Sequence, residues 1–360
     1  MWPVPAGERK DMDDRIRVVV LGTGQMGSGM IKLLLEKEGV DVVGVYGRRA
    51  ERTGTDVGEA IGLGRALGIP LSGDLPKLLK ETGPHIALQA TCSKVVDATE
   101  EIMTLLNHGV NVVSIAEEMS YPAYESPRAA EEIAVLAREK GLTVVGTGIN
   151  PGFVLDLLVI ALTGVCFRVD SVTAKRINDL SPYGPSVLTT QGVGITPEAF
   201  QRGVKDGSVV GHFGFNESVS MIAKALGWKI DRIEQTREPI VSRVKRETPF
   251  VKIEPGLTAG CTHTATAYMG DRPVIHLIHP QQVHPYLEDV ETGDYIEIKG
   301  DPDVNFSSGP EIPGGIGTIA LAVNMIPPVI NGEAGLKSMA ELPVPAAIMG
   351  DIRDLIRKKE

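Results

Sequence analysis

The stretch IRVVVLGTGQMG, residues 16–27, decides the fold that this sequence predicts. Apolar residues that favour a β-strand lead directly into glycines at 22, 24 and 27, and an amphipathic segment follows at residues 30–37. A strand, a G-x-G-x-x-G turn and a helix in this order are typical of a dinucleotide site. An ordinary glycine-rich turn between strand and helix is the alternative. We assign cofactor binding to the six residues of the turn, Gly22, Thr23, Gly24, Gln25, Met26 and Gly27.

The glycines of this turn have separate physical roles. Gly22 permits a tight turn, Gly24 lets the backbone approach a pyrophosphate, and Gly27 lets the helix pack against the strand. The pyrophosphate then lies on the free N–H groups at the positive end of the helix.

Composition narrows the possible partners. With 46 acidic and 36 basic residues, the formal net charge of -10 disfavours a nucleic acid or an anionic membrane as partner. The longest apolar run, residues 153–165, contains Asp156 and is too short to span a bilayer. Cys92, Cys166 and Cys261 have no C-x-x-C spacing, which fits reduced thiols in the cytoplasm better than disulfides or a zinc site. Residues 1–14 are polar and are expected to form a loose N-terminal arm rather than a signal peptide.

Strand and helix patterns alternate through residues 15–150, which we expect to form a dinucleotide-binding Rossmann domain. Short apolar runs predict strands buried on both faces, as in the doubly wound parallel sheet of an α/β fold. The predicted strands are residues 16–21, 42–46, 86–89, 110–115 and 143–145. The predicted helices are residues 30–37, 56–67, 75–81, 94–108 and 127–140.

A different pattern, with longer alternating runs, follows the glycine- and proline-rich turn at residues 146–153. It predicts a mostly antiparallel α+β domain over residues 151–312 that binds the substrate. Its predicted strands are residues 171–177, 239–246, 262–268, 273–278 and 295–299, and its predicted helices are residues 153–162, 197–204 and 217–226. Residues 313–360 contain an apolar helix that glycines open and Pro327 and Pro328 close, and we expect this segment to pack back on the first domain.

The end of the second predicted strand bears on the choice of cofactor. NAD-specific sites usually place an acidic residue there, about 20 residues after the glycines, to bind the ribose 2′-hydroxyl. This chain has Arg48 and Arg49 instead, and guanidinium groups suit a 2′-phosphate. We expect NADP, or use of both NADP and NAD, unless the two arginines belong to a solvated loop.

Two further strand ends supply candidates for cofactor contacts, because loops at the carboxyl ends of such strands border the cofactor. Small side chains follow the strand at 86–89, namely Thr91, Cys92 and Ser93, although Ser93 could also cap the next helix. The constrained turn after the strand at 143–145 contributes Gly148, Asn150 and Pro151, and an interdomain hinge is the compatible alternative there.

Two adjacent acids, Glu117 and Glu118, follow the strand at 110–115. This strand end lies on the nicotinamide side of the crevice, so we expect one of the two to be a catalytic carboxylate. The alternative is a pair of acids at a helix entry, where they interact favourably with the helix dipole.

Polar clusters in the second half are candidates for the substrate pocket. Arg176 and Asn178 alternate and therefore share one face of a strand, and Tyr183 follows them. Arg176 could bind a carboxylate bidentately or form an ion pair with Asp179 or another acid. An isolated His212 lies in VGHFG, residues 210–214. A third group comprises His276, His279 and His284, but no metal-ligand spacing accompanies it, and we expect no metal.

Several longer motifs together resemble a known family. They are VVVLGTGQMG, ATCS, VVSIAEEMSYP, GTGINPGFVLD, KRINDLSPYG and GGIGTIALAVNMIPPVI. The chain resembles the 2,4-diaminopentanoate dehydrogenases and the related native amine dehydrogenases, which share a fold with dihydrodipicolinate reductases. It lacks the paired-histidine motif, the lysine and the Asp-Ala-Pro-Ser-Gly-Thr run of those reductases, so reduction of a dihydropyridine dicarboxylate is disfavoured.

The resemblance implies a Rossmann domain, a mixed-sheet substrate and dimerisation domain, and a homodimer. It implies NAD(P)-dependent oxidative deamination of 2,4-diaminopentanoate to 2-amino-4-oxopentanoate and ammonia, with reductive amination as the reverse. A glutamate of the pair Glu117 and Glu118 would be the base, and the residues that match pocket positions of the family are Arg176, Asn178, Tyr183 and His212. A broader dehydrogenase of short alkylamines, or a dinucleotide-binding protein without turnover, is the alternative.

Overall fold

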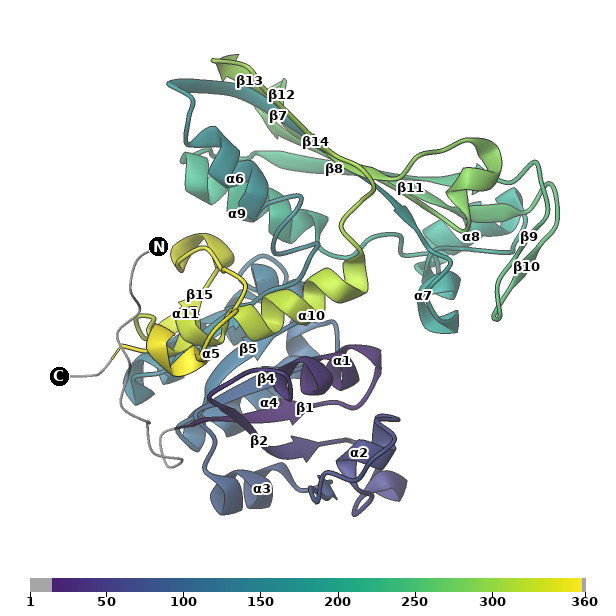
Figure 1. Ribbon diagram of the computed structural model, residues 1–360. Coiled ribbons are helices and arrows are strands. Elements are labelled where there is room, and N and C mark those ends of the chain that lie inside the picture. Colours follow the sequence, from purple (N-terminus) through teal and green to yellow (C-terminus); the bar gives the residue numbers. More distant parts are fainter. Residues whose placement is uncertain (1–14, 358–360) are drawn as a thin grey trace, which may run out of the picture. The chain divides into compact units, whose positions relative to one another are not determined.

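A computed structural model describes residues 15–357, in two compact units (Figure 1). Unit 1 comprises the described residues up to Thr147 together with those from Thr318 onward, and unit 2 comprises Gly148–Gly317. The arm expected at residues 1–14 lies outside the described residues.

Unit 1 is built on a seven-stranded sheet in the order β15-β6-β5-β4-β1-β2-β3. Every neighbouring pair in it is parallel. The strands are β1 (Ile16–Leu21), β2 (Val40–Tyr46), β3 (Leu71–Ser72), β4 (Ile86–Gln89), β5 (Asn111–Ser114), β6 (Thr143–Gly146) and β15 (Gly335–Lys337). The predicted doubly wound α/β fold is confirmed, since apolar strands such as β4 and β6 are buried along their whole length.

Helices connect these strands, as the alternating sequence pattern predicts. They are α1 (Gln25–Leu34), α2 (Val57–Ala60), α3 (Leu75–Thr82), α4 (Val95–Asn107) and α5 (Pro127–Lys140), with the short 3-10 turns η2 (Ala50–Arg52) and η3 (Glu117–Ser120). Local signals set their ends: the Asp74 carboxylate accepts a hydrogen bond from the Lys77 N–H at the start of α3, and Gly141 ends α5 in the left-handed conformation.

The helix predicted at residues 56–67 is wrong, because only Val57–Ala60 is helical. Glycines at 62, 64 and 68 adopt positive φ, which interrupts the helix. The Asp56 carboxylate accepts hydrogen bonds from the backbone N–H groups of Leu67 and Gly68 and closes the segment into a loop. These two hydrogen bonds, together with a third from the Gly58 N–H, lower the pKa of Asp56.

The C-terminal segment adds the last strand to the sheet of unit 1. The chain forms α10 (Gly314–Asn324) and α11 (Ile326–Ile330), and β15 then pairs in parallel with β6. The expectation that Pro327 and Pro328 close the helix is wrong, because they occupy the first turn of α11. Proline is tolerated there because the first N–H groups of a helix have no partner within the helix. Short 3-10 turns follow at η5 (Met339–Glu341) and η6 (Ile352–Leu355).

Unit 2 contains a six-stranded sheet in the order β14-β13-β7-β12-β11-β8. The strands are β7 (Arg168–Asp179), β8 (Arg232–Val241), β11 (Thr258–Met269), β12 (Arg272–Gln282), β13 (Gly293–Asp301) and β14 (Val304–Ser308). Only β7 and β12 pair in parallel, so the sheet is mixed as predicted. The helices are α6 (Leu157–Thr163), α7 (Pro185–Thr190), α8 (Pro197–Asp206) and α9 (Phe215–Leu226).

The strand predicted at residues 239–246 is misplaced, since β8 ends at Val241. β8 is an edge strand whose side chains alternate between half-buried and exposed, and its exposed side is charged and polar. Its apolar signal is therefore weak. Arg246 belongs instead to a short pair of strands, β9 (Arg246–Glu247) and β10 (Lys252–Ile253).

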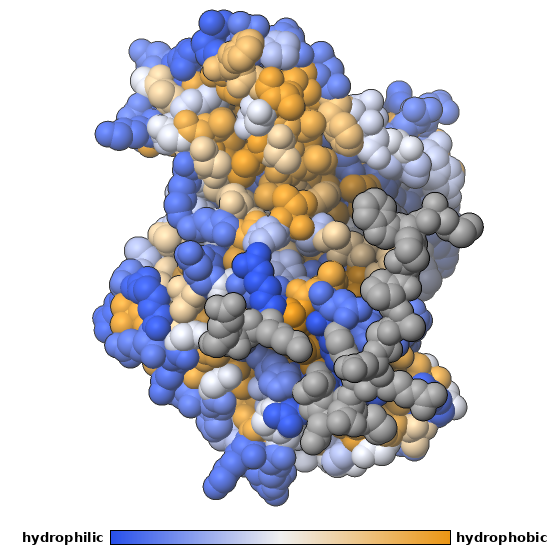
Figure 2. Space-filling view, turned by 60° about the vertical axis from the view of Figure 1, so that its left-hand side comes forward, coloured by the Kyte–Doolittle hydropathy of each residue, from blue (hydrophilic) through white to orange (hydrophobic). Residues whose placement is uncertain are grey.

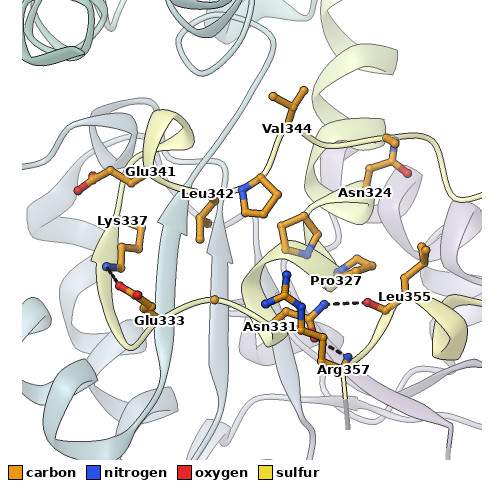
Figure 3. Close-up of a pocket in the computed structure, with 14 residues that line it drawn as sticks. Asn324, Pro327, Asn331, Glu333, Lys337, Glu341, Leu342, Val344, Leu355 and Arg357 are labelled. Carbon is orange, nitrogen blue, oxygen red and sulfur yellow. Dashed lines mark hydrogen bonds and ion pairs between the residues drawn. The ribbon is translucent and has the colours of Figure 1, made fainter. Parts of the chain in front are cut away.

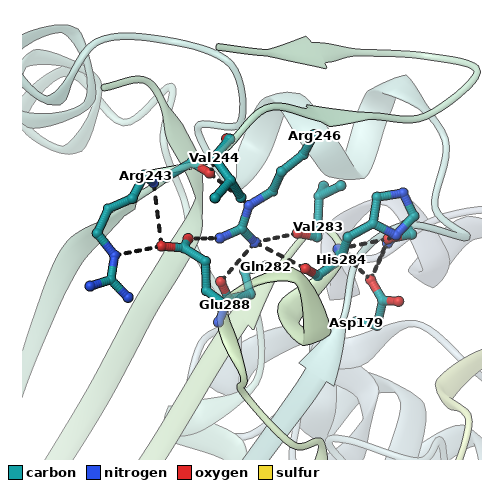
Figure 4. A network of polar contacts seen from close by, with 10 residues as sticks. Asp179, Arg243, Val244, Arg246, Gln282, Val283, His284 and Glu288 are labelled. Atoms are coloured by element: carbon teal, nitrogen blue, oxygen red, sulfur yellow. Dashed lines mark hydrogen bonds and ion pairs between the residues drawn. The ribbon is translucent and has the colours of Figure 1, made fainter. Parts of the chain in front are cut away.

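A buried arginine fixes the turn that follows β12 (Figure 4). Arg246 is 1% exposed, forms an ion pair with Glu288, and donates to the Gln282 side chain and the Val283 carbonyl. Arg243 approaches Glu288 from the other side, with Nε and Oε1 2.7 Å apart. A buried guanidinium with this many acceptors holds the 3-10 turn η4 (Pro285–Glu288) against the sheet.

The surface mixes hydrophilic and hydrophobic residues, and hydrophobic ones gather over part of the face that Figure 2 presents. Phe167 and Val165, which follow α6, are among the most exposed large hydrophobic residues, at 96% and 69%. Among the described residues, no helix combines the length and the apolar character that crossing a membrane requires.

Candidate active site

The glycine turn between β1 and α1 leaves room for a ligand at one of its glycines. A Cβ on Gly22 would lie 2.5 Å from the Ala90 carbonyl oxygen, and one on Gly27 would lie 2.1 Å from the Gly22 carbonyl oxygen. Among the described residues, no atom lies within 4 Å of a Cβ built on Gly24. Gly24 also begins α1 without a side-chain cap, so the first N–H groups of the helix have no cap there. The turn therefore fits a pyrophosphate.

An arginine that sequence reasoning missed supports the turn. Arg52 donates from Nη1 to the Thr23 hydroxyl at 3.0 Å and from Nη2 to the Ala60 carbonyl at 2.6 Å. It comes from η2, after β2, and so it ties the glycine turn to the next loop of unit 1. Its place three residues after Arg49 is the only signal in the sequence, and that signal is not specific.

Arg48 is held by a carboxylate from a different element. Its Nε donates to Oε1 of Glu101, on α4, at 2.8 Å, and its Nη2 donates to the Asp97 carbonyl at 2.9 Å. The Thr91 hydroxyl donates to Oε2 of the same carboxylate at 2.5 Å. Arg49 is exposed and makes no ion pair with any described residue.

The loop after β4 arranges the remaining predicted cofactor residues of unit 1. Cys92 is half-buried, and burial raises the pKa of its thiol. Ser93 is not the residue that begins α4: that position is Lys94, which provides no side-chain cap. The Ser93 side chain instead acts to lower the pKa of the Glu117 carboxyl group.

The structure gives the two adjacent acids different tasks. Oε2 of Glu118 accepts the backbone N–H of Val95 at 2.8 Å, so Glu118 caps the start of α4 from outside. Glu117 has no such task, and burial raises the pKa of its carboxyl group, with the charge of Glu118 acting in the same direction. Hydrogen bonds from its own N–H and from Ser93 oppose that rise. A carboxyl group with a raised pKa is a candidate for a general base.

Thr147 is a second residue that the sequence did not single out. It follows β6, is 2% exposed, and its backbone N–H donates to the Ser114 carbonyl at 2.9 Å. Its Oγ1 is buried and has no hydrogen-bond partner among the described residues. A buried hydroxyl without a partner at the carboxyl edge of the sheet is a candidate for contact with a ligand.

In unit 2, alternate residues of β7 face the covered side of the sheet. Arg176 and Asn178 lie on this side and are 2% and 5% exposed. Nη1 of Arg176 and Oδ1 of Asp294, on β13, are 2.6 Å apart, and Nη2 donates to the Ile312 carbonyl at 2.5 Å. The alternative expected for Arg176, an ion pair with Asp179 or another acid, is therefore present, and the acid is Asp294. Tyr183 follows Asn178 closely in the chain and is half-buried. Burial raises the pKa of its hydroxyl.

A histidine between two asparagines extends this cluster. Nε2 of His279 lies 3.0 Å from Oδ1 of Asn178, and its Nδ1 lies 3.4 Å from Nδ2 of Asn150. The amide oxygen of Asn178 accepts and the amide nitrogen of Asn150 donates, so a neutral ring with its proton on Nε2 satisfies both. Gly148 and Pro151 lie close to Asn150 in the chain and are buried, and the Asn150–Pro151 peptide bond is cis.

His212 packs among aromatic rings next to this group. Its ring centroid is 4.7 Å from that of His279 and 4.8 Å from that of Phe215. Burial lowers the pKa of His212 to about 3. Its Nε2 is buried and has no hydrogen-bond partner among the described residues. The backbone N–H of His212 donates to Nδ1 of His263, whose Nε2 lies 2.9 Å from Oε1 of Gln235.

The three histidines of the third sequence cluster lie in different surroundings. His276 pairs with the Thr266 hydroxyl, His279 belongs to the cluster above, and His284 contacts Ser181. Within residues 15–357, no group of three or more His, Cys, Asp or Glu residues is placed to hold a metal ion.

A pocket of about 460 Å³ lies in the C-terminal part of unit 1 (Figure 3). Prolines and Leu342 line it together with Lys337, which pairs with Glu333, and Arg357. It contains none of the predicted site residues. The candidate residues of unit 1 are those of the glycine turn, the β4 loop and Glu117, and the candidate residues of unit 2 are those of its buried polar cluster.

Comparisons with known proteins show which family the chain is similar to. The family described as 2,4-diaminopentanoate dehydrogenase C-terminal domain matches residues 153–358, and dihydrodipicolinate reductase, N-terminus, matches residues 16–116. The chain is 45% identical over 348 residues to the 2,4-diaminopentanoate dehydrogenase of Acetoanaerobium sticklandii, covering 96% of this chain and 98% of that protein.

Two amine dehydrogenases are also similar. That of Streptomyces virginiae is 25% identical over 75% of this chain and 76% of its own length. The solved structure of the amine dehydrogenase from Mycobacterium smegmatis is 31% identical, with a TM-score of 0.80, and covers 91% of this chain and 96% of that one. The resemblance predicted from the motifs is confirmed, and this chain belongs to the 2,4-diaminopentanoate dehydrogenase family.

Proposed function

We propose that this chain catalyses the NAD(P)-dependent oxidative deamination of 2,4-diaminopentanoate to 2-amino-4-oxopentanoate and ammonia. The observation that carries the proposal is Glu117, a carboxylate with a raised pKa that follows a parallel strand of a dinucleotide-binding unit. The relative from Acetoanaerobium sticklandii, which bears the name of this activity, supports it over nearly the whole chain.

The chemistry requires a base before hydride can leave. The bound cofactor supplies a hydride acceptor. An ammonium group has no lone pair to drive hydride loss, so the substrate amine must first give up a proton. We assign that proton to the Glu117 carboxylate, which passes it on to solvent. The regenerated carboxylate then stabilises the positive iminium group and accepts a proton from the water that hydrolyses it. Glu118 is not assigned this role, because its carboxylate accepts the Val95 N–H at the start of α4.

The buried cluster of unit 2 is proposed to bind the substrate. Asn178, Tyr183 and His212 supply neutral hydrogen-bonding groups that suit an amino-acid substrate. The guanidinium of Arg176 already bonds to Asp294 and to the Ile312 carbonyl, so only its remaining N–H groups are left for a substrate carboxylate. We propose that Arg176 contributes mainly by holding this side of the sheet.

A turnover assay tests the proposal. Reduction of NADP or NAD is followed with 2,4-diaminopentanoate, simple alkylamines and hydroxy acids. We expect the highest kcat/KM with 2,4-diaminopentanoate. Faster turnover of simple alkylamines would favour the broader amine dehydrogenase. Dinucleotide binding without turnover of any amine would favour a non-catalytic protein.

We also propose a homodimer located in the cytoplasm. The uncovered side of the unit 2 sheet carries a hollow of about 370 Å³, lined by Tyr295 and Phe306 on β13 and β14. Both side chains are 36% exposed, which suits contact with a second copy. The three cysteines are free thiols, as expected in a reducing compartment. Light scattering checks the mass: a monomer at micromolar concentration would contradict the dimer.

A further inference from the structure

The cofactor-preference rule for this fold concerns the end of β2, where an acid favours NAD and an arginine favours NADP. By that rule, Arg48 alone favours NADP. The structure adds a carboxylate that the rule does not consider, because Glu101 reaches Arg48 from α4, 53 residues along the chain. At Arg48, the end of β2 therefore carries an ion pair rather than a free cation.

Glu101 is held firmly by neighbours other than Arg48. Its Oε2 accepts from Nε2 of Gln89 at 2.7 Å and from the Thr91 hydroxyl at 2.5 Å. Gln89 is fixed in turn, because its Oε1 accepts the Ser114 hydroxyl at 2.8 Å. The Glu101 side chain is only 8% exposed. These bonds fix the position of the Glu101 carboxylate independently of Arg48.

Arg48 is the exposed member of the pair. Its side chain is 43% exposed, while its Nε is directed to Glu101 and its Nη2 to the Asp97 carbonyl. Burial of the partner makes the pair stronger than one between two exposed groups. A phosphate that approaches Arg48 meets a guanidinium whose charge is largely cancelled and whose orientation is already fixed.

We propose that Glu101 sets the cofactor preference of this enzyme by holding Arg48 against α4 and neutralising its charge. The proposal deepens the assigned NAD(P) use and rests on it. A ribose 2′-phosphate then gains little from Arg48, while a 2′-hydroxyl meets no uncompensated charge. Arg48 should therefore contribute little to a preference for NADP over NAD. Glu101 acts through Arg48, so it is a positioning residue.

The test measures dissociation constants of NAD and NADP by calorimetry, without an amine. In Glu101→Gln the glutamine has a similar volume and still accepts from Gln89 and Thr91, but it no longer pairs with Arg48. We expect NADP binding to tighten about three- to tenfold while NAD binding stays within twofold, because only NADP carries the additional phosphate charge. Added salt should reduce the difference.

Glu100→Gln is the matched control. It removes the same charge from the next residue of α4, but Glu100 is exposed. We expect its ratio of dissociation constants for NADP and NAD to stay within about twofold of the wild-type ratio, because exposed charges are screened by solvent. A shift as large as that of Glu101→Gln would show a general charge effect and overturn the proposal.

Arg48→Ala tests whether Glu101 acts through Arg48, and it changes an exposed residue. Because this variant leaves the Glu101 carboxylate without its cation, it should weaken the binding of NADP more than that of NAD. The double variant, Glu101→Gln with Arg48→Ala, should lose the gain of Glu101→Gln. In Glu101→Gln, an unchanged ratio of the NADP and NAD dissociation constants, or a selective loss of NADP binding, would overturn the proposal. A gain in NADP binding that persists in the double variant would also overturn it. Failure of amine turnover leaves these binding results intact and concerns only the proposed reaction.

Discussion

Replacing Glu117 with glutamine separates its role from that of Glu118. Glutamine keeps the size and the hydrogen-bonding capacity of the side chain but cannot accept the substrate proton. Loss of a general base costs about 10²–10⁴ in rate. This loss corresponds to about 3–5 kcal/mol in the activation free energy. We expect kcat at saturating 2,4-diaminopentanoate to fall by that factor, while the dissociation constants of NAD and NADP remain unchanged.

Glu118→Gln is the control, because the glutamine oxygen can still accept the Val95 N–H that caps α4. We expect its kcat to stay within about tenfold of the wild-type value, since a cap contributes to stability rather than to proton transfer. If Glu118→Gln loses the activity and Glu117→Gln keeps it, the assignment of the base is refuted. If both variants stay near the wild-type rate, neither acid is the base.

Glu117→Gln should also change how the stability of the protein depends on pH, and the pKa shift determines the direction of that change. Burial raises the pKa of Glu117 in the folded state above its unfolded value of about 4.3. Between these two values the folded state binds more protons, so wild-type stability falls as pH rises through that window. Glu117→Gln should therefore be more stable than wild type at neutral pH and equal to it below about pH 4. Thermal unfolding at the two pH values checks this, and a lower Tm at neutral pH would contradict the burial argument.

Three further predictions concern buried groups of unit 2. Asp294→Ala should lower the free energy of unfolding by about 3–5 kcal/mol in urea titration, because it leaves Arg176 buried without its partner; a loss below about 1 kcal/mol would contradict this. Asp156→Ala should cost about 2–4 kcal/mol, because its carboxylate accepts two backbone N–H groups and the Ser218 hydroxyl, and Asp156→Asn should recover part of that. Burial lowers the pKa of His263 to about 2, so lowering the pH from about 7 to about 5 should cost about 2 kcal/mol of stability as the unfolded state takes up the proton. His263→Gln should lose this dependence, and an unchanged pH slope would show that His263 titrates alike in both states.

The elements that sequence patterns predicted well have local causes. β1 and β4 match their predicted ranges, and α5 matches at both ends, because an apolar run, a proline at the first turn and a glycine after the last turn are all local signals. Where such signals conflict, the prediction fails. The segment at residues 56–67 has apolar residues at helical spacing, but its glycines and the Asp56 carboxylate favour a loop.

The sequence predicted which residues belong to the candidate site better than it predicted the role of each residue. The glycine turn, the arginines after β2 and the acids after β5 follow from their positions at strand ends. Which acid is free for catalysis does not, since Glu117 and Glu118 are neighbours with the same chemistry. We propose Glu117 as the base because the Val95 N–H at the start of α4 engages Glu118.

The sequence by itself determined that the chain binds a dinucleotide, that it has a parallel sheet followed by a mixed one, and to which family it is similar. Those properties depend on periodicity and motifs within a few residues. Only the tertiary structure decided which charges are paired, because Glu101 lies 53 residues from Arg48 and Asp294 lies 118 residues from Arg176. Strand register and helix packing bring these partners together, and neither can be inferred from a pattern of neighbouring residues.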